Sequence, residues 1–184
     1  SFNLDEYLPM PKESEQSYHY FMHHHLFDHI DIDPKNIHIP DGTLKAEEIE
    51  NFCKEYERQI EAAGGIDIQV LGIGRTGHIG FNEPGSPLTS KTRMVYLDDL
   101  TIKDAAGDFG GMENVPSRAI TMGVGTIMKA RKVILLAWGE KKASIIKATV
   151  EGSVSDAVPA TFLQVHPNVQ FVIDESAAEE LTRA

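Results

Sequence analysis

The chain has 184 residues, of which 41% are apolar and 24% are charged, and its formal net charge is −11. This length suffices for one domain, residues 1–184, with a full hydrophobic core, and the composition is typical of a globular protein. An acidic chain is a poor electrostatic partner for nucleic acid and for anionic membranes, so we expect neither as a partner.

Two further counts narrow the class of protein. Cys53 is the only cysteine, so an intrachain disulfide is excluded, and we expect a reducing compartment such as the cytoplasm. No apolar run approaches the ~20 residues that a membrane-spanning helix needs.

In chain order, the hydrophobic pattern predicts helices and strands that alternate. Asp5 is expected to follow the end of a strand, and the glycine-rich residues 100–115 are expected to form a mobile surface segment. The run Lys132–Ala137 is continuously apolar and predicts a strand covered on both faces. Helices are expected over residues 14–30, 46–63, 116–130, 140–150 and 175–183, and strands over residues 66–73, 92–97, 132–137 and 169–173.

This alternation predicts the α/β fold class. We expect a doubly wound, mainly parallel sheet with helices on both faces, a Rossmann-like arrangement in three layers. Ligands of such folds bind beyond the carboxyl ends of the strands, so the residues that follow strands are the first to consider as a site.

The most informative segment is the glycine-rich run from Leu71 to Ser86, which directly follows the strand predicted over residues 66–73. Its glycines allow a tight backbone path that larger side chains would obstruct. The run carries one imidazole, His78, and one carboxylate, Glu83. Because histidine exchanges protons near neutral pH and a carboxylate can orient it, this pair is a candidate catalytic site.

Two other charged groups have alternative interpretations from the residues alone. Asp5 is either a general base at a strand end or a helix cap. Lys142, after the strand 132–137 and near a helix start, either binds an anion such as a phosphate or is a solvated lysine. Ser86 and Arg93 could also contact an anion, although exposed polar turns are the ordinary alternative.

Other patterns argue against a metal or a cofactor. Three consecutive residues of a helix point in different directions, so His23, His24 and His25 do not converge on one ion. The glycine-rich run lacks the spacing of a dinucleotide-binding loop, and no Walker-type sequence occurs. We therefore expect neither a metal nor a nucleotide cofactor.

The chain closely resembles the glucosamine-6-phosphate deaminase family, also called glucosamine-6-phosphate isomerases. The resemblance covers essentially the whole chain, and the sequence Gly77-His78-Ile79-Gly80-Phe81-Asn82-Glu83-Pro84 is specific to these deaminases. The other matching segments are residues 3–7, 16–18, 39–42, 119–126, 139–143, 150–152, 159–167 and 174–175.

The resemblance implies a cofactor-free enzyme, a hydrolase of an amino-sugar phosphate, that converts glucosamine 6-phosphate and water into fructose 6-phosphate and ammonia. By this resemblance His78 opens the sugar ring, Glu83 orients His78, and Asp5 moves the proton from C2. Lys142 matches the residue that holds the phosphate, and the substrate is expected against Gly74 and Gly77.

The chain also departs from the family pattern. Thr76 replaces an acidic or amide residue in the catalytic group, and Gly107 occupies the position of a phosphate-binding arginine. Ser86 and Arg93 match an allosteric amino-sugar site, but Val95 replaces a lysine of that site. Family members carry an N-terminal strand and phosphate loop before Asp5, so we expect this chain to be a fragment of a longer protein.

Three functions remain open at this point. The first is the deaminase, the second is a sugar-phosphate lactonase or isomerase on the same fold, and the third is a sugar-phosphate-binding module without catalysis. The family includes both monomers and hexamers, so the sequence leaves open whether the chain forms a homo-oligomer.

Overall fold

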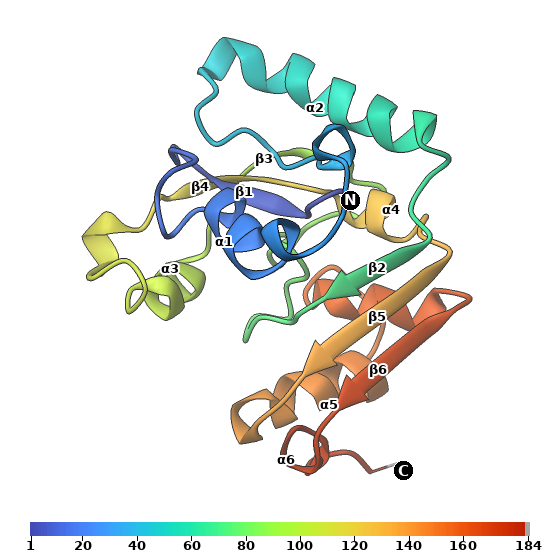
Figure 1. Ribbon diagram of the computed structural model, residues 1–184. Helices are drawn as coiled ribbons and strands as arrows, with labels where there is room; N and C mark the ends of the chain where they lie inside the picture. Colours follow the sequence, from blue (N-terminus) through green and yellow to red (C-terminus); the bar gives the residue numbers. More distant parts are fainter. Residues whose placement is uncertain (183–184) are drawn as a thin grey trace. The chain divides into compact units, whose positions relative to one another are not determined.

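The computed structural model describes residues 1–182, and the chain divides into two compact units (Figure 1). One unit comprises residues 1–60 and 92–122, and the other comprises residues 61–91 and the chain from Gly123 onward. Each unit has its own three-stranded sheet. The single domain expected from the chain length stays a prediction.

The first unit contains an antiparallel sheet in the order β1-β4-β3. Its strands are β1 (Asp5–Leu8), β3 (Arg93–Tyr96) and β4 (Arg118–Thr121). Its helices are α1 (Tyr18–His25), most of α2 (Ala46–Ala62) and α3 (Asp99–Ala105), with 3₁₀ turns η1 (Phe27–His29), η2 (Pro34–Asn36) and η3 (Met112–Asn114).

Helix α2 packs against this sheet, as its amphipathic pattern predicts. Ile49 and Cys53 of the helix form one buried cluster with Leu8 of β1 and Ile120 of β4. Tyr56 continues the same buried face and is 2% exposed. The helix predicted over residues 46–63 is therefore confirmed, and its apolar face is what attaches it to the sheet.

The helix predicted over residues 116–130 is wrong. Residues 118–121 form β4, and only Val124–Ile127 are helical, as α4. β4 is the central strand, paired with β1 on one side and β3 on the other, and Ile120 is fully buried. Two ladders of backbone hydrogen bonds and this burial outweigh helix propensities of ~0.5 kcal/mol per residue.

Two other expectations for the first unit need correction, while the expected mobility of residues 100–115 stays a prediction. The helix expected over residues 14–30 begins only at Tyr18, because the Ser17 side chain accepts a hydrogen bond from the Tyr20 backbone N–H (2.9 Å) and caps the helix there. The segment 100–115 contains most of α3 and all of η3. Asp5 is the first residue of β1 and does not follow a strand end.

The second unit contains a parallel sheet in the order β2-β5-β6. Its strands are β2 (Ile68–Leu71), β5 (Lys132–Ala137) and β6 (Val169–Ile173). Its other elements are α4, η4 (Glu140–Lys142), α5 (Ala143–Glu151), η5 (Pro159–Val165) and α6 (Glu175–Ala178). The α/β class and the parallel strands are confirmed, and the helix expected to reach residue 183 ends at Ala178 within the described residues.

The two faces of the parallel sheet differ in burial. Leu71, Val133 and Leu135 point to one face and are at most 1% exposed. The opposite face carries Ile68 and Val70, which are 57% and 51% exposed. The expectation that β5 is covered on both faces is therefore wrong, since burial alternates along the strand.

Among the residues that the structure describes, no helix combines the length and the apolar character that crossing a membrane requires.

The hydrogen bonds of the Tyr56 hydroxyl are expected to stabilise the first unit. The hydroxyl lies 2.8 Å from the carbonyl oxygen of Asn3 and 3.1 Å from that of His38, and so links two segments to α2. We expect Tyr56→Phe to lower the free energy of unfolding by about 1–2 kcal/mol, because a buried hydrogen bond is lost. Urea denaturation measures this loss. Tyr96→Phe, at a tyrosine that is 70% exposed, is the control and should change it little.

Candidate active site

The glycine-rich run forms a compact loop directly after β2. The backbone N–H of Gly74 donates to the carbonyl of His78 (3.1 Å), and that of Gly77 donates to the carbonyl of Gly74 (3.0 Å). Gly77 and Gly80 have φ angles of +80° and +57°, a region that residues with a Cβ rarely adopt. The loop therefore returns on itself and places His78 beside Gly74.

Gly74 leaves room for the imidazole. A Cβ atom built on this glycine would lie 2.1 to 2.6 Å from Cε1, Nε2 and Cδ2 of His78. Any side chain at position 74 would therefore occupy the space of the ring. The sequence identified this glycine as part of a tight backbone path, and the structure gives it a specific packing role.

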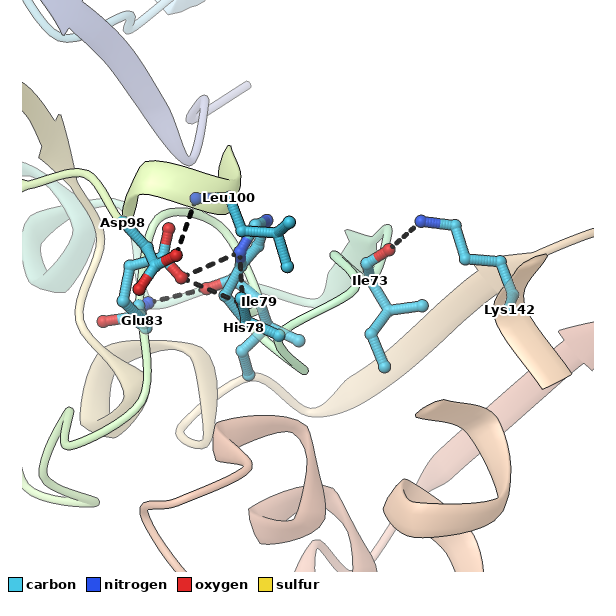
Figure 2. A network of polar contacts seen from close by, with 9 residues as sticks. Ile73, His78, Ile79, Glu83, Asp98, Leu100 and Lys142 are labelled. Atoms are coloured by element: carbon cyan, nitrogen blue, oxygen red, sulfur yellow. Dashed lines mark hydrogen bonds and ion pairs between the residues drawn. The ribbon is translucent and has the colours of Figure 1, made fainter. Parts of the chain in front are cut away.

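Three side chains converge at this loop. His78 Nδ1 lies 2.9 Å from the Thr76 hydroxyl. The same nitrogen lies 3.1 Å from Oε2 of Glu83, and Figure 2 shows His78 and Glu83 side by side. The Thr76 hydroxyl also donates to Oε2 of Glu83 at 2.9 Å. The His78 and Glu83 side chains are only 16% and 13% exposed. The structure thus brings together the three residues that the sequence placed in the catalytic group on this run.

The contacts also assign the protons of the triad. Because the Thr76 hydroxyl donates to the carboxylate, its oxygen is left to accept, and Nδ1–H of His78 donates between Thr76 and Glu83. A neutral imidazole in this tautomer carries its lone pair on Nε2. Thr76 has no charge, yet it contacts both partners, so the expected third member of the group is present as a neutral hydrogen-bonding residue.

Residues that the sequence analysis did not select support the loop. Asn82 is fully buried, and its side-chain amide donates to the Ile79 carbonyl (2.8 Å), which fixes the turn between His78 and Glu83. The Ala160 backbone N–H donates to the carbonyl of Gly77 (2.9 Å). Asn82 stands in the motif and could have been selected as a turn residue, whereas no local signal predicts the contact from Ala160.

Lys142 ends η4 and directly precedes α5, where the sequence predicted it. Its ammonium donates to the carbonyl oxygen of Ile73 at 2.7 Å, as Figure 2 shows. The cation therefore lies at the carboxyl end of β2, beside the start of the glycine-rich loop. This is the edge where parallel sheets bind ligands, and binding of a phosphate by Lys142 stays a prediction.

Asp5 belongs to the other unit, where it opens β1 opposite Thr121 of β4. Burial and the neighbouring charge of Glu6 raise the pKa of Asp5 to about 7, and a hydrogen bond with the Thr121 side chain opposes part of this rise. A carboxyl group that titrates near neutral pH can act as a general base or acid, which a fully exposed aspartate does poorly.

The two residues expected at an allosteric site lie in different units. Ser86 is 8% exposed, and its backbone N–H donates to the Glu83 carbonyl (3.0 Å), so it helps to close the glycine-rich loop. Arg93 lies in β3 opposite Thr121, in the same row across the sheet as Asp5, and burial lowers its pKa. An allosteric role for this pair stays a prediction.

The histidines of α1 make local contacts. His23 Nδ1 lies 3.0 Å from a carboxylate oxygen of Asp28, and the carbonyl of His24 lies 2.8 Å from Nε2 of His29. Within residues 1–182 no three His, Cys, Asp or Glu side chains are grouped as metal ligands.

Comparison with known proteins first defines the class of this protein. The profile of the family described as glucosamine-6-phosphate isomerases/6-phosphogluconolactonase matches residues 2–172. The chain therefore belongs to this family, which joins two groups of proteins that act on sugar phosphates.

Particular relatives lie on the deaminase side of the family. A glucosamine-6-phosphate deaminase of Shewanella woodyi is 57% identical over 182 residues, which are 99% of this chain and 68% of the relative. One of Thermoanaerobacter pseudethanolicus is 52% identical over 97% of this chain and 70% of the relative. A deaminase-like protein of Bacteroides thetaiotaomicron is 50% identical, and the match covers 28% of its length.

Solved structures agree with this placement. A structure described as a monomeric glucosamine-6-phosphate deaminase superposes with a TM-score of 0.94 at 39% identity, and the match covers 98% of this chain and 74% of that one. A 6-phosphogluconolactonase from Trypanosoma brucei superposes with a TM-score of 0.74 at 22% identity, over 98% of this chain and 73% of that one. At that identity the likeness shows the shared fold alone.

The packing of His78 on Gly74 can be tested by a substitution that fills the space between them. Gly74→Ala should displace the imidazole, because the new methyl group overlaps it, and should change the ring resonances of His78 in a histidine-selective NMR spectrum. Gly72→Ala is the matched control, since a Cβ there meets nothing within 4 Å. Equal spectra for the two variants would contradict the packing role of Gly74.

Proposed function

We propose that this chain converts glucosamine 6-phosphate and water into fructose 6-phosphate and ammonia, by deamination coupled to an aldose–ketose isomerisation. The observation that carries the proposal is the His78–Glu83 pair, 3.1 Å apart on a strand-end loop. Identities above 50% to proteins named glucosamine-6-phosphate deaminase, over nearly the whole chain, support the choice of substrate.

The first step assigned to this site is the opening of the sugar ring. His78 transfers a proton between the C1 hydroxyl and the ring oxygen through Nε2, because Nδ1 is held by Thr76 and Glu83. The carboxylate of Glu83 fixes the ring orientation and stabilises the imidazolium that forms during the transfer. Gly74 and Gly77, which shape the loop under His78, lie against the sugar in this proposal.

The second step is the proton transfer between neighbouring carbons. Asp5 as a carboxylate removes the proton from C2 to give an enolamine, and the proton returns to C1. The imine that results adds water and releases ammonia, which leaves the ketose phosphate. Lys142 neutralises part of the phosphate charge throughout these steps.

A coupled assay of ammonia release tests the proposal. With glucosamine 6-phosphate, we expect the chain to release ammonia, and we expect His78→Ala and Asp5→Asn each to lower kcat by about 10²- to 10⁴-fold, the usual contribution of a general acid or base. Asp31→Asn, at an exposed loop carboxylate, is the matched control and should leave the rate unchanged.

Two further measurements, made beside the ammonia assay, select between the alternative functions. Hydrolysis of 6-phosphogluconolactone without ammonia release would assign the chain to the lactonase side of its family. Binding of glucosamine 6-phosphate in a calorimeter, with no turnover of either compound, would indicate a binding module.

The environment of Asp5 predicts how kcat/KM depends on pH. The base form of this residue is the carboxylate, and its pKa of about 7 means that the carboxylate is lost as the pH falls through neutrality. We therefore expect kcat/KM to fall about tenfold per pH unit below pH 7. A rate that stays constant down to pH 5 would contradict the assignment of Asp5 as the base.

A further inference from the structure

Glu6 is a carboxylate buried in the middle of a strand. It is only 2% exposed and belongs to β1, the strand that Asp5 opens. A buried ionised carboxylate is costly unless hydrogen bonds or charges compensate it. Glu6 has no part in the proposed reaction, so its burial requires an explanation.

Three backbone N–H groups compensate the Glu6 carboxylate. Oε1 accepts from Tyr7 (2.9 Å) and from Tyr18 (3.1 Å), and Oε2 accepts from His19 (3.0 Å). Tyr18 and His19 are the first two residues of α1, whose N–H groups have no partner within the helix. Glu6 therefore completes the cap of a helix that begins twelve residues further along the chain.

Ser17, the residue directly before α1, caps the same turn. Its hydroxyl accepts from the backbone N–H of Tyr20 at 2.9 Å, and its side chain is fully buried. The first turn of α1 thus has a neutral cap, Ser17, and a charged cap, Glu6. Only the charged cap comes from β1, and only it adds a negative charge next to Asp5.

We propose that Glu6 is a positioning residue for Asp5: its carboxylate fixes β1 to the first turn of α1 and places a second negative charge on the residue next to Asp5. This inference rests on the proposed function, in which Asp5 is the base. Glu6 lies on the opposite face of the strand from Asp5, so it acts through the backbone and through its charge.

The charge of Glu6 has a direct consequence for Asp5. A like charge nearby disfavours the ionised form, and after burial it is the largest cause that raises the pKa of Asp5. The pKa of Glu6 itself is raised by burial, which its three N–H partners oppose. Among the described residues, Asp41 and the phenols of Tyr7, Tyr18 and Tyr56 also interact with one or both of these carboxyls.

The test measures the titration of Asp5 directly, so it does not depend on turnover. In the chain labelled with ¹³C at the aspartate carboxyls, Asp5→Asn assigns the Asp5 resonance. We expect Glu6→Gln, which keeps the length and removes the charge, to lower the pKa of Asp5 by about one unit. In the active enzyme the acid limb of the kcat/KM profile should move to lower pH by the same amount.

Ser17→Ala is the matched control. It removes the neutral cap of the same helical turn and should lower the midpoint of thermal unfolding while leaving the titration of Asp5 unchanged. A folded Glu6→Gln variant whose Asp5 titrates as in the unmodified chain would overturn the proposal. If ammonia release is absent from every variant but Glu6→Gln still shifts the titration, the proposed function fails and the positioning role of Glu6 stands.

A conservative variant covers the case in which Glu6→Gln does not fold. Glu6→Asp keeps the charge and shortens the side chain, which weakens its reach to Tyr18 and His19. We expect the pKa of Asp5 to stay raised in this variant while α1 loses stability. A fall of the Asp5 pKa by about one unit in Glu6→Asp would contradict the role of the Glu6 charge.

Discussion

The packing of one imidazole on one glycine is the constraint on which the candidate site depends. His78 occupies the space that a side chain of Gly74 would need, and this contact brings Nδ1 within reach of Thr76 and Glu83. If the ring were displaced, the hydrogen bonds that select its tautomer would be lost together. The glycines of the run therefore both allow the tight turn and leave space for the imidazole of His78.

The proposed reaction needs one carboxylate that orients His78 and another that transfers a proton, and the environments of Glu83 and Asp5 suit these two tasks. Glu83 accepts hydrogen bonds from a hydroxyl and an imidazole, which suits a group that orients its partner. Burial and the neighbouring charge of Glu6 raise the pKa of Asp5 to about 7, which suits a group that exchanges a proton. The same chemical group thus performs two tasks because its surroundings differ.

Prediction from the sequence succeeded where the local pattern and the tertiary structure agree. The helix α2 was recognised because its amphipathic pattern matches the face that it buries, and β5 and β6 were recognised as strands from their short apolar runs. The segment 116–130 was misassigned because β4 is stabilised by pairing with β1 and β3, which are remote in the sequence. The antiparallel sheet as a whole escaped prediction for the same reason.

The sequence by itself determined the chemistry available to this protein: His78 and Glu83 on one glycine-rich run, with Asp5 and Lys142 as further charged groups. Their short spacing in the run made the first pair predictable, since a loop of glycines can bring residues five apart together. Only the tertiary structure decided the proton positions, the pKa of Asp5 and the burial of Glu6. These properties depend on contacts with Thr121 and with the first turn of α1, which no local pattern encodes.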